Sequence, residues 1–308
     1  MNDWFRYFFG ENGVSNLYLW SVPIHIVLIV TEIIYSNFKK YSWYETRDTA
    51  TTVFFSLCNF GLDLLLKVFS FYILFLFFDY RFITWENGVW YWILLFFAQD
   101  LAYYVLHFVD HHSRIFWAIH VTHHNSEYFN LTTGFRSSVF QPLYRFVYFI
   151  PLVLLGFNPL HILSVYAIVQ IYGTWIHTQS IAKLGFLEKF MVTPSHHRVH
   201  HASNQLYLDR NMGQGFIIWD KIFGTFQHEE NPEQYEKIKF GLTAPIEDKN
   251  PMKLIFTELV NIYKDATQKN ISFSDRLKYI FYPPGWSHVD ASKMSVHLRK
   301  EAKNKVKK

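Results

Sequence analysis

Residues 196–201 read HHRVHH, the densest group of histidines in a chain of 308 residues that contains 16 of them. Two further clusters precede this segment. The clusters are an HxxxH at His107 and His111, an HxxHH at His120, His123 and His124, and a second HxxHH at His197, His200 and His201. Because residues three or four apart lie on one face of a helix, we expect each cluster to direct its imidazoles toward one point.

These eight histidines predict a site for two metal ions. Imidazole is the commonest metal ligand in proteins and suits iron, zinc, copper and nickel. Eight nitrogens exceed the roughly four to six ligands that one ion binds, so two ions are expected. A lone histidine on an apolar helix is more often a buried structural residue, and we assign His25 and His161 to that class. We expect His228 and His288 at the surface.

The composition predicts a membrane protein. Half of the residues are hydrophobic and 18% are charged, whereas about a quarter are charged in typical soluble domains. Several apolar blocks reach the roughly 20 residues that a helix needs to cross a bilayer. The net charge of +4 comes without a basic stripe or a nucleic-acid-binding motif, so no nucleic-acid partner is expected. The single cysteine, Cys58, excludes an intramolecular disulfide.

The apolar blocks predict four to five membrane spans, at about 17–35, 53–78, 88–106, 143–157 and 159–176. The short turn between the last two makes them a hairpin, which returns the chain to the side on which the third span ends. All histidine clusters then lie at one face of the membrane. The predicted fold is therefore an all-α integral membrane bundle with a histidine-rich di-metal cap.

The distribution of basic residues predicts that this cap faces the cytosol. On the histidine side lie Lys39, Lys40, Arg47, Arg114, Arg136 and the basic C-terminal tail, whereas Arg6 and Arg81 lie on the other side. We expect the bacterial inner membrane or the endoplasmic reticulum. After His201 the chain is expected to turn soluble, and residues 252–266 have the periodicity of a helix that packs on the domain or on the membrane surface.

Polar residues inside the expected spans are candidates for function. Asp63 and Lys67 are four apart and could neutralise each other, either structurally or as part of a catalytic site. Asp100 lies on the helix face that carries His107. We expect its carboxylate to accept the distal N–H of His107 once that imidazole binds metal, which would fix the tautomer. Pairing of Asp100 with another buried donor is the alternative.

The ligand types favour redox chemistry on a lipid. The clusters contain no carboxylate or thiolate, which argues against magnesium, calcium and a structural zinc finger. The sequence has no HExxH, no GxSxG and no dinucleotide fingerprint. Two transition-metal ions at the mouth of an apolar bundle suit the activation of O2 and attack on a C–H bond. The chain has no flavin, haem or iron–sulfur motif, so we expect an external electron donor.

The clusters resemble those of the fatty acid hydroxylase/sterol desaturase superfamily of membrane di-iron oxygenases. Four runs within about 88–245 are similar to its alkylglycerol monooxygenase branch. They are HHNSEYFNLTTGFRSS at 123–138, GTWIHTQSI at 173–181, TPSHHRVHH at 193–201 and GFIIWDKIFGTF at 215–226. The chain departs from the common pattern at Phe108, where Arg is frequent, at His112, where the branch has an acidic residue, and at Met212, where it has Tyr.

The resemblance implies a di-iron site whose ligands are the eight clustered histidines together with His177, and His196 is an additional candidate. It implies hydroxylation of an alkylglycerol-like ether lipid, a fatty acyl chain or a sterol by O2. The electrons would come from a tetrahydropterin or a redox protein, and zinc could replace iron in a purified sample. Residues 1–86 would form N-terminal spans, 87–245 the catalytic domain and 246–308 a cytosolic cap with a basic tail. A lipid desaturase on the same fold and a non-catalytic metal-binding membrane protein are the alternatives.

Overall fold

The computed structural model describes residues 13–306, and this part of the chain is all-α, as predicted. It contains no β-strand; its only β-type pairings are the isolated bridges Met191–Phe216 and Ala202–Phe240. Arg6, on which part of the orientation prediction rests, lies outside the described residues.

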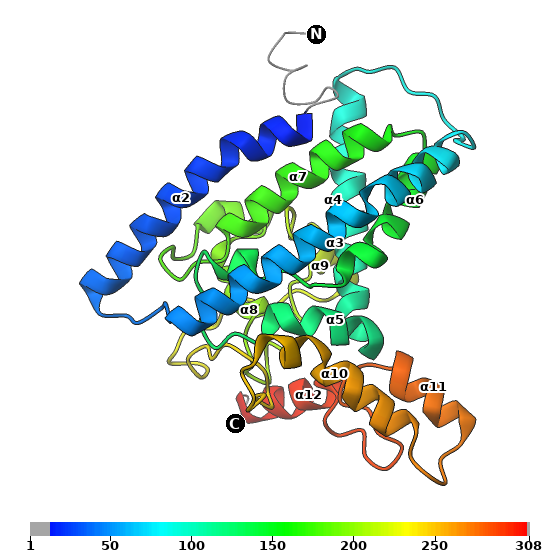
Figure 1. Ribbon diagram of the computed structural model, residues 1–308. Helices are drawn as coiled ribbons and strands as arrows, with labels where there is room; N and C mark the ends of the chain where they lie inside the picture. The colour runs from blue at the N-terminus through cyan, green and yellow to red at the C-terminus, as the bar shows by residue number, and fades with distance from the viewer. Residues whose placement is uncertain (1–12, 307–308) are drawn as a thin grey trace.

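Three long helices have the length and apolar composition that a membrane crossing requires. They are α2 (Gly13–Lys39), α3 (Thr46–Phe78) and α4 (Val89–His112). With 33 residues, α3 is about 50 Å long, more than the roughly 30 Å hydrocarbon core of a bilayer. Such a helix must tilt or extend beyond the core. Figure 1 shows α2, α3 and α7 inclined relative to α4.

The fourth and fifth predicted spans form shorter elements. Residues 143–157 contain the 3-10 helix η3 (Arg145–Phe149) and α6 (Ile150–Leu154), and the second segment is α7 (Pro159–Trp175). The turn between them lies where it was predicted. Gly156 has φ +91°, and a Cβ on it would lie 1.9 Å from the carbonyl oxygen of Ile83, so only glycine fits this turn. The hairpin packs on the long helices: α6 contacts α3, and α7 contacts α2 and α4.

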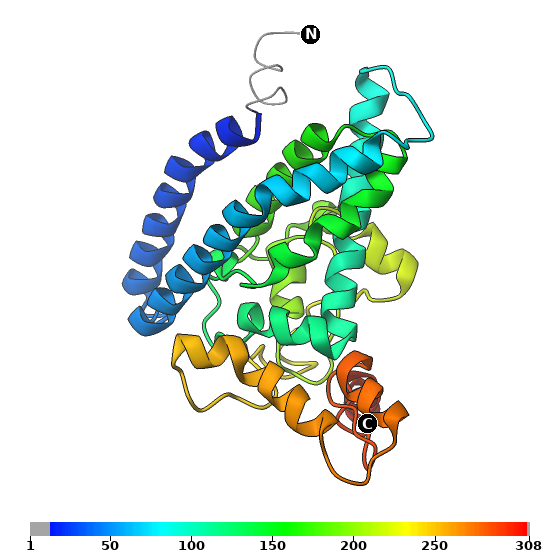
Figure 2. The same ribbon diagram turned by 45° about the vertical axis from the view of Figure 1, so that its right-hand side comes forward.

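The remaining elements of the described chain are shorter helices. They are η1 (Thr133–Phe135), η2 (Gln141–Leu143), η4 (Gly185–Lys189), α5 (Arg114–His124), α8 (Pro194–His200), α9 (Ile218–Phe223), α10 (Pro251–Ala266), α11 (Phe273–Phe281) and α12 (Ser295–Val306). The predicted helix at 252–266 is confirmed as α10, capped by the Asn250 side chain. In Figures 1 and 2, α10–α12 lie beside α5, at the end opposite the start of α2.

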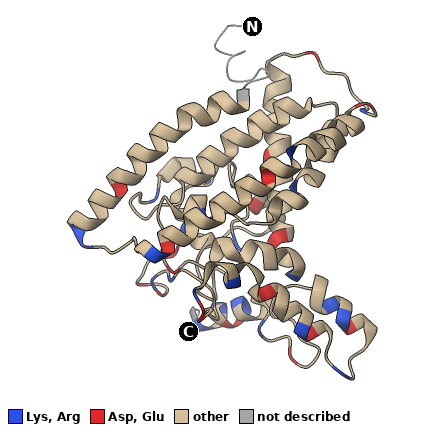
Figure 3. Cartoon of the chain, viewed as in Figure 1, with Lys and Arg blue, Asp and Glu red and all other residues tan. Residues whose placement is uncertain are grey.

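Charged side chains follow the same division. Figure 3 shows Lys and Arg concentrated around α5 and α10–α12, whereas α2, α3 and α7 carry few charges. Asp63 in α3 pairs with Arg145 of η3, so its predicted pairing with Lys67 is wrong. The guanidinium of Arg145 also lies 5.1 Å from the ring centre of Tyr166 in α7. This pair therefore joins separate elements, a role that a pair within one helix would not have.

Candidate metal centre

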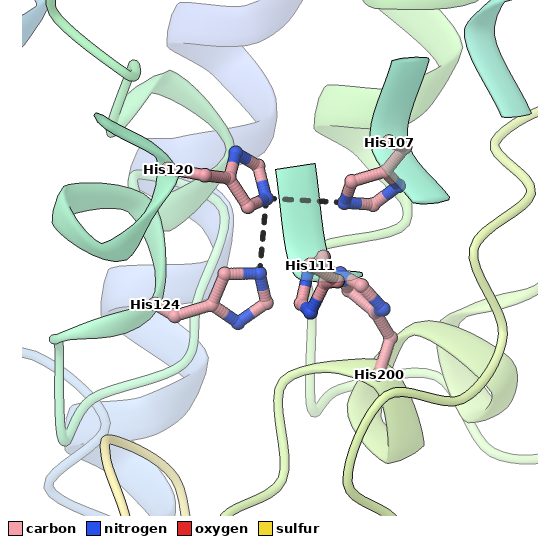
Figure 4. Close-up of side chains that lie close together, drawn as sticks. All are labelled: His107, His111, His120, His124 and His200. Atoms are coloured by element: carbon pink, nitrogen blue, oxygen red, sulfur yellow. Dashed lines mark hydrogen bonds between the residues drawn. The ribbon is translucent and has the colours of Figure 1, made fainter. Parts of the chain in front are cut away.

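All nine histidines named as ligands come together at one end of the bundle, in two groups. Site A contains His107, His111, His120, His124 and His200, and site B contains His123, His177, His197 and His201. Within each group the candidate ligand nitrogens lie within 4.8 Å of one another. Eight of the nine side chains are buried, and His123 is half-buried. Figure 4 shows the five imidazoles of site A pointing toward one another from α4, α5 and α8.

The two HxxHH clusters are each divided between the sites. In α5, His120 and His124 belong to site A and His123 to site B. In α8 and the residue that follows it, His200 belongs to site A, and His197 and His201 to site B. The expectation that each cluster serves one point is therefore wrong for these two. Adjacent residues are rotated by about 100° around a helix, so His123 and His124 face different sites.

The ring nitrogens approach one another closely inside each site. In site A, Nε2 of His120 lies 3.1 Å from Nε2 of His107 and 3.2 Å from Nε2 of His124. In site B, Nε2 of His177 lies 2.8 Å from Nε2 of His197 and 3.4 Å from Nε2 of His123. The sharp turn at Ser113, with φ −127° and ψ 122°, lets α5 fold back beside α4 and brings the first two clusters together.

Backbone carbonyls fix the outer nitrogen of four imidazoles. His107 Nδ1 donates to Met212 O (2.8 Å), His123 to Arg136 O (2.8 Å), His177 to Gly173 O (2.6 Å) and His200 to Arg210 O (2.9 Å). A carbonyl oxygen can only accept, so each of these Nδ1 atoms carries the proton and each Nε2 carries a lone pair. This tautomer is the one that a metal ligand needs.

Some of these lone pairs have no donor in the protein. His123 and His177 both donate through Nδ1, so the 3.4 Å contact between their Nε2 atoms joins two lone pairs. The Nε2 atoms of His111, His200 and His201 are buried and have no hydrogen-bond partner. Unsatisfied buried acceptors are unfavourable, and a cation between them would remove that penalty. The residues therefore fit metal ions that bind imidazole.

The electrostatics keep His120, His123, His124 and His201 uncharged. Burial, reinforced by the neighbouring imidazoles, holds the pKa of His120, His124 and His201 well below the usual range. Burial lowers the pKa of His123 to about 4. At neutral pH these rings are unprotonated, so their lone pairs are available to metal.

Two carboxylates that sequence reasoning missed contact site A. Asp209 Oδ1 lies 3.1 Å from Nδ1 of His111; burial would raise the pKa of Asp209, but the hydrogen bond from His111 and nearby imidazoles lower it to about 2. Asp110 Oδ2 lies 3.7 Å from Nδ1 of His120 and is fixed by Tyr144 and Gln141. The position of Asp110 directly before His111 is a signal that could have found it. Asp209 gives no such signal.

One short segment, residues 209–212, supplies acceptors to three of the five imidazoles of site A. Its acceptors are Asp209 Oδ1 for His111, Arg210 O for His200 and Met212 O for His107. Asp209 and Asn211 have φ 48° and 55°, left-handed values that Asn and Asp tolerate better than most residues. Met212 acts here through its backbone, so the difference from the usual Tyr does not remove this contact.

Asp220 and Asn211 hold the 209–212 segment in place. The Asp220 carboxylate accepts from Met212 N (2.6 Å) and Gly213 N (2.8 Å). The Asn211 side chain donates to the carbonyl oxygens of His196 (3.0 Å) and Gln227 (2.8 Å). Both side chains are buried. The segment that orients site A is therefore fixed on both sides.

Asp100 does not contact His107, and the expectation that it orients this imidazole is wrong. The Nδ1 atom of His107 is bonded to Met212 O, and Asp100 accepts from Gly215 N (2.9 Å), Phe216 N (3.0 Å) and Trp219 Nε1 (3.0 Å). Seven residues of helix, about 10 Å, separate Asp100 from His107. The alternative, pairing with another buried donor, is what the structure shows.

The remaining histidines have other roles. His196 lies outside both groups and forms a capping box with Thr193 at the start of α8. His25 is buried, and His161 is partly buried and bonded to the Tyr91 hydroxyl (2.8 Å). His228 and His288 are exposed, as predicted. His112 stacks on Phe108, with ring centres 3.8 Å apart, and belongs to neither site.

Comparison with known proteins identifies related sequences over the part of the chain that builds both sites. Residues 92–225 match the family model of fatty acid hydroxylase. Human alkylglycerol monooxygenase is 41% identical over 207 residues, which are 66% of this chain and 44% of the relative. The Xenopus tropicalis alkylglycerol monooxygenase is 38% identical over 211 residues, 68% of this chain and 45% of the relative.

A second group of relatives is more distant. Human lathosterol oxidase is 32% identical over 144 residues, 46% of this chain and 45% of that protein. The chain thus spans less than half the length of the curated relatives that it matches. No solved structure matches the chain.

Proposed function

We propose that the protein is a membrane-bound monooxygenase that hydroxylates a lipid with O2, because residues 92–225 match the family model of fatty acid hydroxylase. The observation that carries the proposal is the pair of adjoining sites built from nine imidazoles, eight of them buried. These sites lie at the end of three helices suited to a membrane. An alkylglycerol-like ether lipid, a fatty acyl chain or a sterol is the proposed substrate class.

We propose that sites A and B each hold one iron ion through the Nε2 or Nδ1 atoms of the nine histidines. Iron, when bound, supplies the activation of O2 that oxidation of an unactivated C–H bond requires. Zinc also binds imidazole well and can occupy such sites in a purified sample. The electrons are proposed to come from outside the chain, from a reduced pterin or a redox protein.

The protein's own residues orient and isolate these sites. The backbone carbonyls of Arg136, Gly173, Arg210 and Met212 hold Nδ1 protons and leave Nε2 lone pairs directed inward. Phe129 covers site B, with its ring centre 5.2 Å from that of His201, and stacks in turn on Phe240 at 4.7 Å. Such covering excludes water from the reacting groups. The Tyr103 ring packs against His107 on the membrane side of site A, at 5.4 Å.

The proposed topology places the histidine end in the cytosol, in a bacterial inner membrane or the endoplasmic reticulum. The concentration of Lys and Arg around α5 and α10–α12 supports it. The proposed division of the chain keeps residues 1–86 as membrane spans, 87–245 as the catalytic domain and 246–308 as a cytosolic cap. Packing of α10 on α5 indicates that this cap and the catalytic domain form an interface.

Lipid desaturation is the second candidate function. The similarity to human lathosterol oxidase over 144 residues favours it, because the name of that relative describes oxidation of a sterol. Hydroxylation and desaturation begin with the same hydrogen abstraction, so the same site could serve both. The mass of the product separates them: hydroxylation adds one oxygen atom, and desaturation removes two hydrogen atoms.

The test is metal analysis and lipid turnover of the detergent-purified chain. We expect about two metal ions per chain, and His200→Ala should reduce this content because it removes a ligand of site A. His228→Ala, which changes an exposed histidine, is the matched control and should leave the metal content unchanged. Metal content that is insensitive to His200→Ala would contradict the site. Lipid turnover that is equal for the zinc-loaded and iron-loaded protein, or absent for both, would contradict the proposed hydroxylation.

A further inference from the structure

We propose that η4 and α9, two short elements that flank the last histidine cluster, lie in the membrane and contact the acyl chains of one leaflet. The contact surface, which we name the rim, consists of Leu184, Phe186, Leu187, Phe190, Ile222 and Phe223. The proposal rests on the proposed membrane location of α4. At α9 it differs from the expectation that the chain is soluble after His201.

The rim is apolar and uncovered. Phe186 is 68% exposed, Ile222 66% and Phe223 56%, and the other three side chains are also exposed. Contiguous exposed apolar side chains mark a surface that binds a protein or a membrane. In Figure 2, α9 lies beside α4 and projects outward from the bundle.

Helix α4 gives the depth of this surface. The ring of Phe216, just before α9, stacks on that of Phe97 in α4, with centres 4.6 Å apart and planes 8° apart. Phe97 precedes His112, the last residue of α4, by 15 residues, a length of about 22 Å along the helix. If α4 crosses a hydrocarbon core of about 30 Å, Phe216 lies well inside that core. Phe223 stacks on Tyr104, at 5.3 Å, so α9 returns toward the histidine end.

The segment that follows η4 is joined to the segment that precedes α9. Phe190 O accepts from Ile217 N (3.0 Å), and Met191 forms the isolated bridge with Phe216. The hydroxyl of Tyr172, near the end of α7, donates to the Val192 carbonyl. The two elements therefore form one continuous surface beside α4, adjoining the apolar face that α4 presents to lipid.

Several backbone N–H groups of this region donate hydrogen bonds to side chains of the protein, as a location in hydrocarbon requires. Non-helical backbone at membrane depth is tolerated only where its N–H and C=O groups find partners within the protein. Asp100 accepts from Gly215 N and Phe216 N, and Asp220 accepts from Met212 N and Gly213 N. Both carboxylates are fully buried. Their placement supports an inserted segment whose polar groups face the protein and whose apolar side chains face outward.

Three lysines at the edge of the rim indicate a bilayer as the occupant. Lys183, Lys189 and Lys221 are exposed, and the Lys189 ammonium lies 5.6 Å from the ring centre of Phe186. The ammonium groups of Lys183 and Lys221 also donate to the carbonyl oxygens of Glu229 and Lys189, both at 2.7 Å. Lysines beside apolar and aromatic side chains can extend their stems along the hydrocarbon and keep their charges near lipid headgroups. This pairing of a basic edge with an apolar surface fits phospholipid better than the apolar surface of a second copy of the chain.

The test is spin-label accessibility of the full chain in vesicles of phosphatidylcholine and phosphatidylglycerol. Cys58→Ser removes the only native cysteine, and single cysteines at Phe186 and Phe223 carry a nitroxide. Leu65 of α3, which is 80% exposed in a candidate span, is the lipid reference. His228 is the aqueous reference. We expect both rim labels to collide more often with O2 than with a water-soluble nickel chelate, as the Leu65 label should.

Rim labels that behave like the His228 label, with Leu65 still in lipid, would overturn this proposal and leave the proposed function intact. Failure of the Leu65 label to report lipid would contradict the membrane location itself, and with it the proposed function. Labels shielded from both reagents, with spin–spin broadening that grows with the protein-to-lipid ratio, would show a second copy on the rim. That outcome would also overturn contact with lipid.

Discussion

Replacement of Asp209 is expected to weaken metal binding at site A more than at site B. Asp209 Oδ1 lies 3.1 Å from Nδ1 of His111, and the two side chains are 17% and 3% exposed. The carboxylate holds the Nδ1 proton and directs the Nε2 lone pair of His111 into the site. It contacts no imidazole of site B, whose members are His123, His177, His197 and His201.

The magnitude follows from the nature of the contact. Loss of an outer hydrogen-bond partner of a metal-binding histidine lowers metal affinity about 10–100-fold, or about 1.4–2.7 kcal/mol. Asp209→Asn keeps an oxygen acceptor but removes the negative charge, so its effect should lie near the lower end. Asp209→Ala removes both acceptor and charge, so its effect should lie near the upper end.

The assay is competition with a chelator for ferrous iron under anaerobic conditions, with the two binding steps resolved. Asp248→Asn changes an exposed carboxylate that pairs with Lys253, and this matched control should bind iron as the wild type does. Equal affinities for the wild type, Asp209→Asn and Asp209→Ala would refute the reasoning. Equal weakening of both steps would show a general loss of structure instead of a change at site A.

Three further outcomes are expected. Gly215→Ala should lower the thermal unfolding midpoint, because the new Cβ would lie 2.7 Å from Asp100 Oδ1 and such overpacking costs about 1–3 kcal/mol. The control Gly61→Ala should leave the midpoint unchanged by this mechanism, because no atom lies within 4 Å of its Cβ. Asp220→Ala should lower the free energy of unfolding by more than about 1 kcal/mol, because it leaves the buried N–H groups of Met212 and Gly213 without an acceptor. Chemical denaturation measures this free energy. Removal of bound metal with a chelator should lower the thermal unfolding midpoint, and added metal should restore it, because ions that bind only the folded protein stabilise it. A midpoint that calorimetry finds unchanged would contradict metal binding.

The sequence contained enough information for the helical class, for α10 and for the gathering of the histidines. Helical spacing places His107 and His111 on one face, and this relation depends only on local geometry. The turn at Gly156 was likewise readable, because its signal is local. Oxidation of a lipid, the identity of the metal and the cytosolic orientation stay proposals.

Features that depend on tertiary contact could not be predicted from spacing. The division of each HxxHH between two sites requires the relative placement of α4, α5 and α8, which no single helix encodes. Asp100 was assigned to His107 because both lie on α4, but the competing backbone N–H groups of Gly215 and Phe216 come from a segment more than a hundred residues away. The role of Asp209 arises from left-handed backbone in a loop, for which the sequence has no periodic signal.

The sharing of α5 and α8 between the two sites makes their occupancies interdependent. An ion at site A would fix the rotation of both helices through His120, His124 and His200. The same rotation determines the direction in which the site B imidazoles of these elements, His123, His197 and His201, point. The second ion would then meet rings that are already aligned, and it would lose less conformational freedom on binding. Partly loaded preparations should thus contain fewer molecules with a single ion than two independent sites would give.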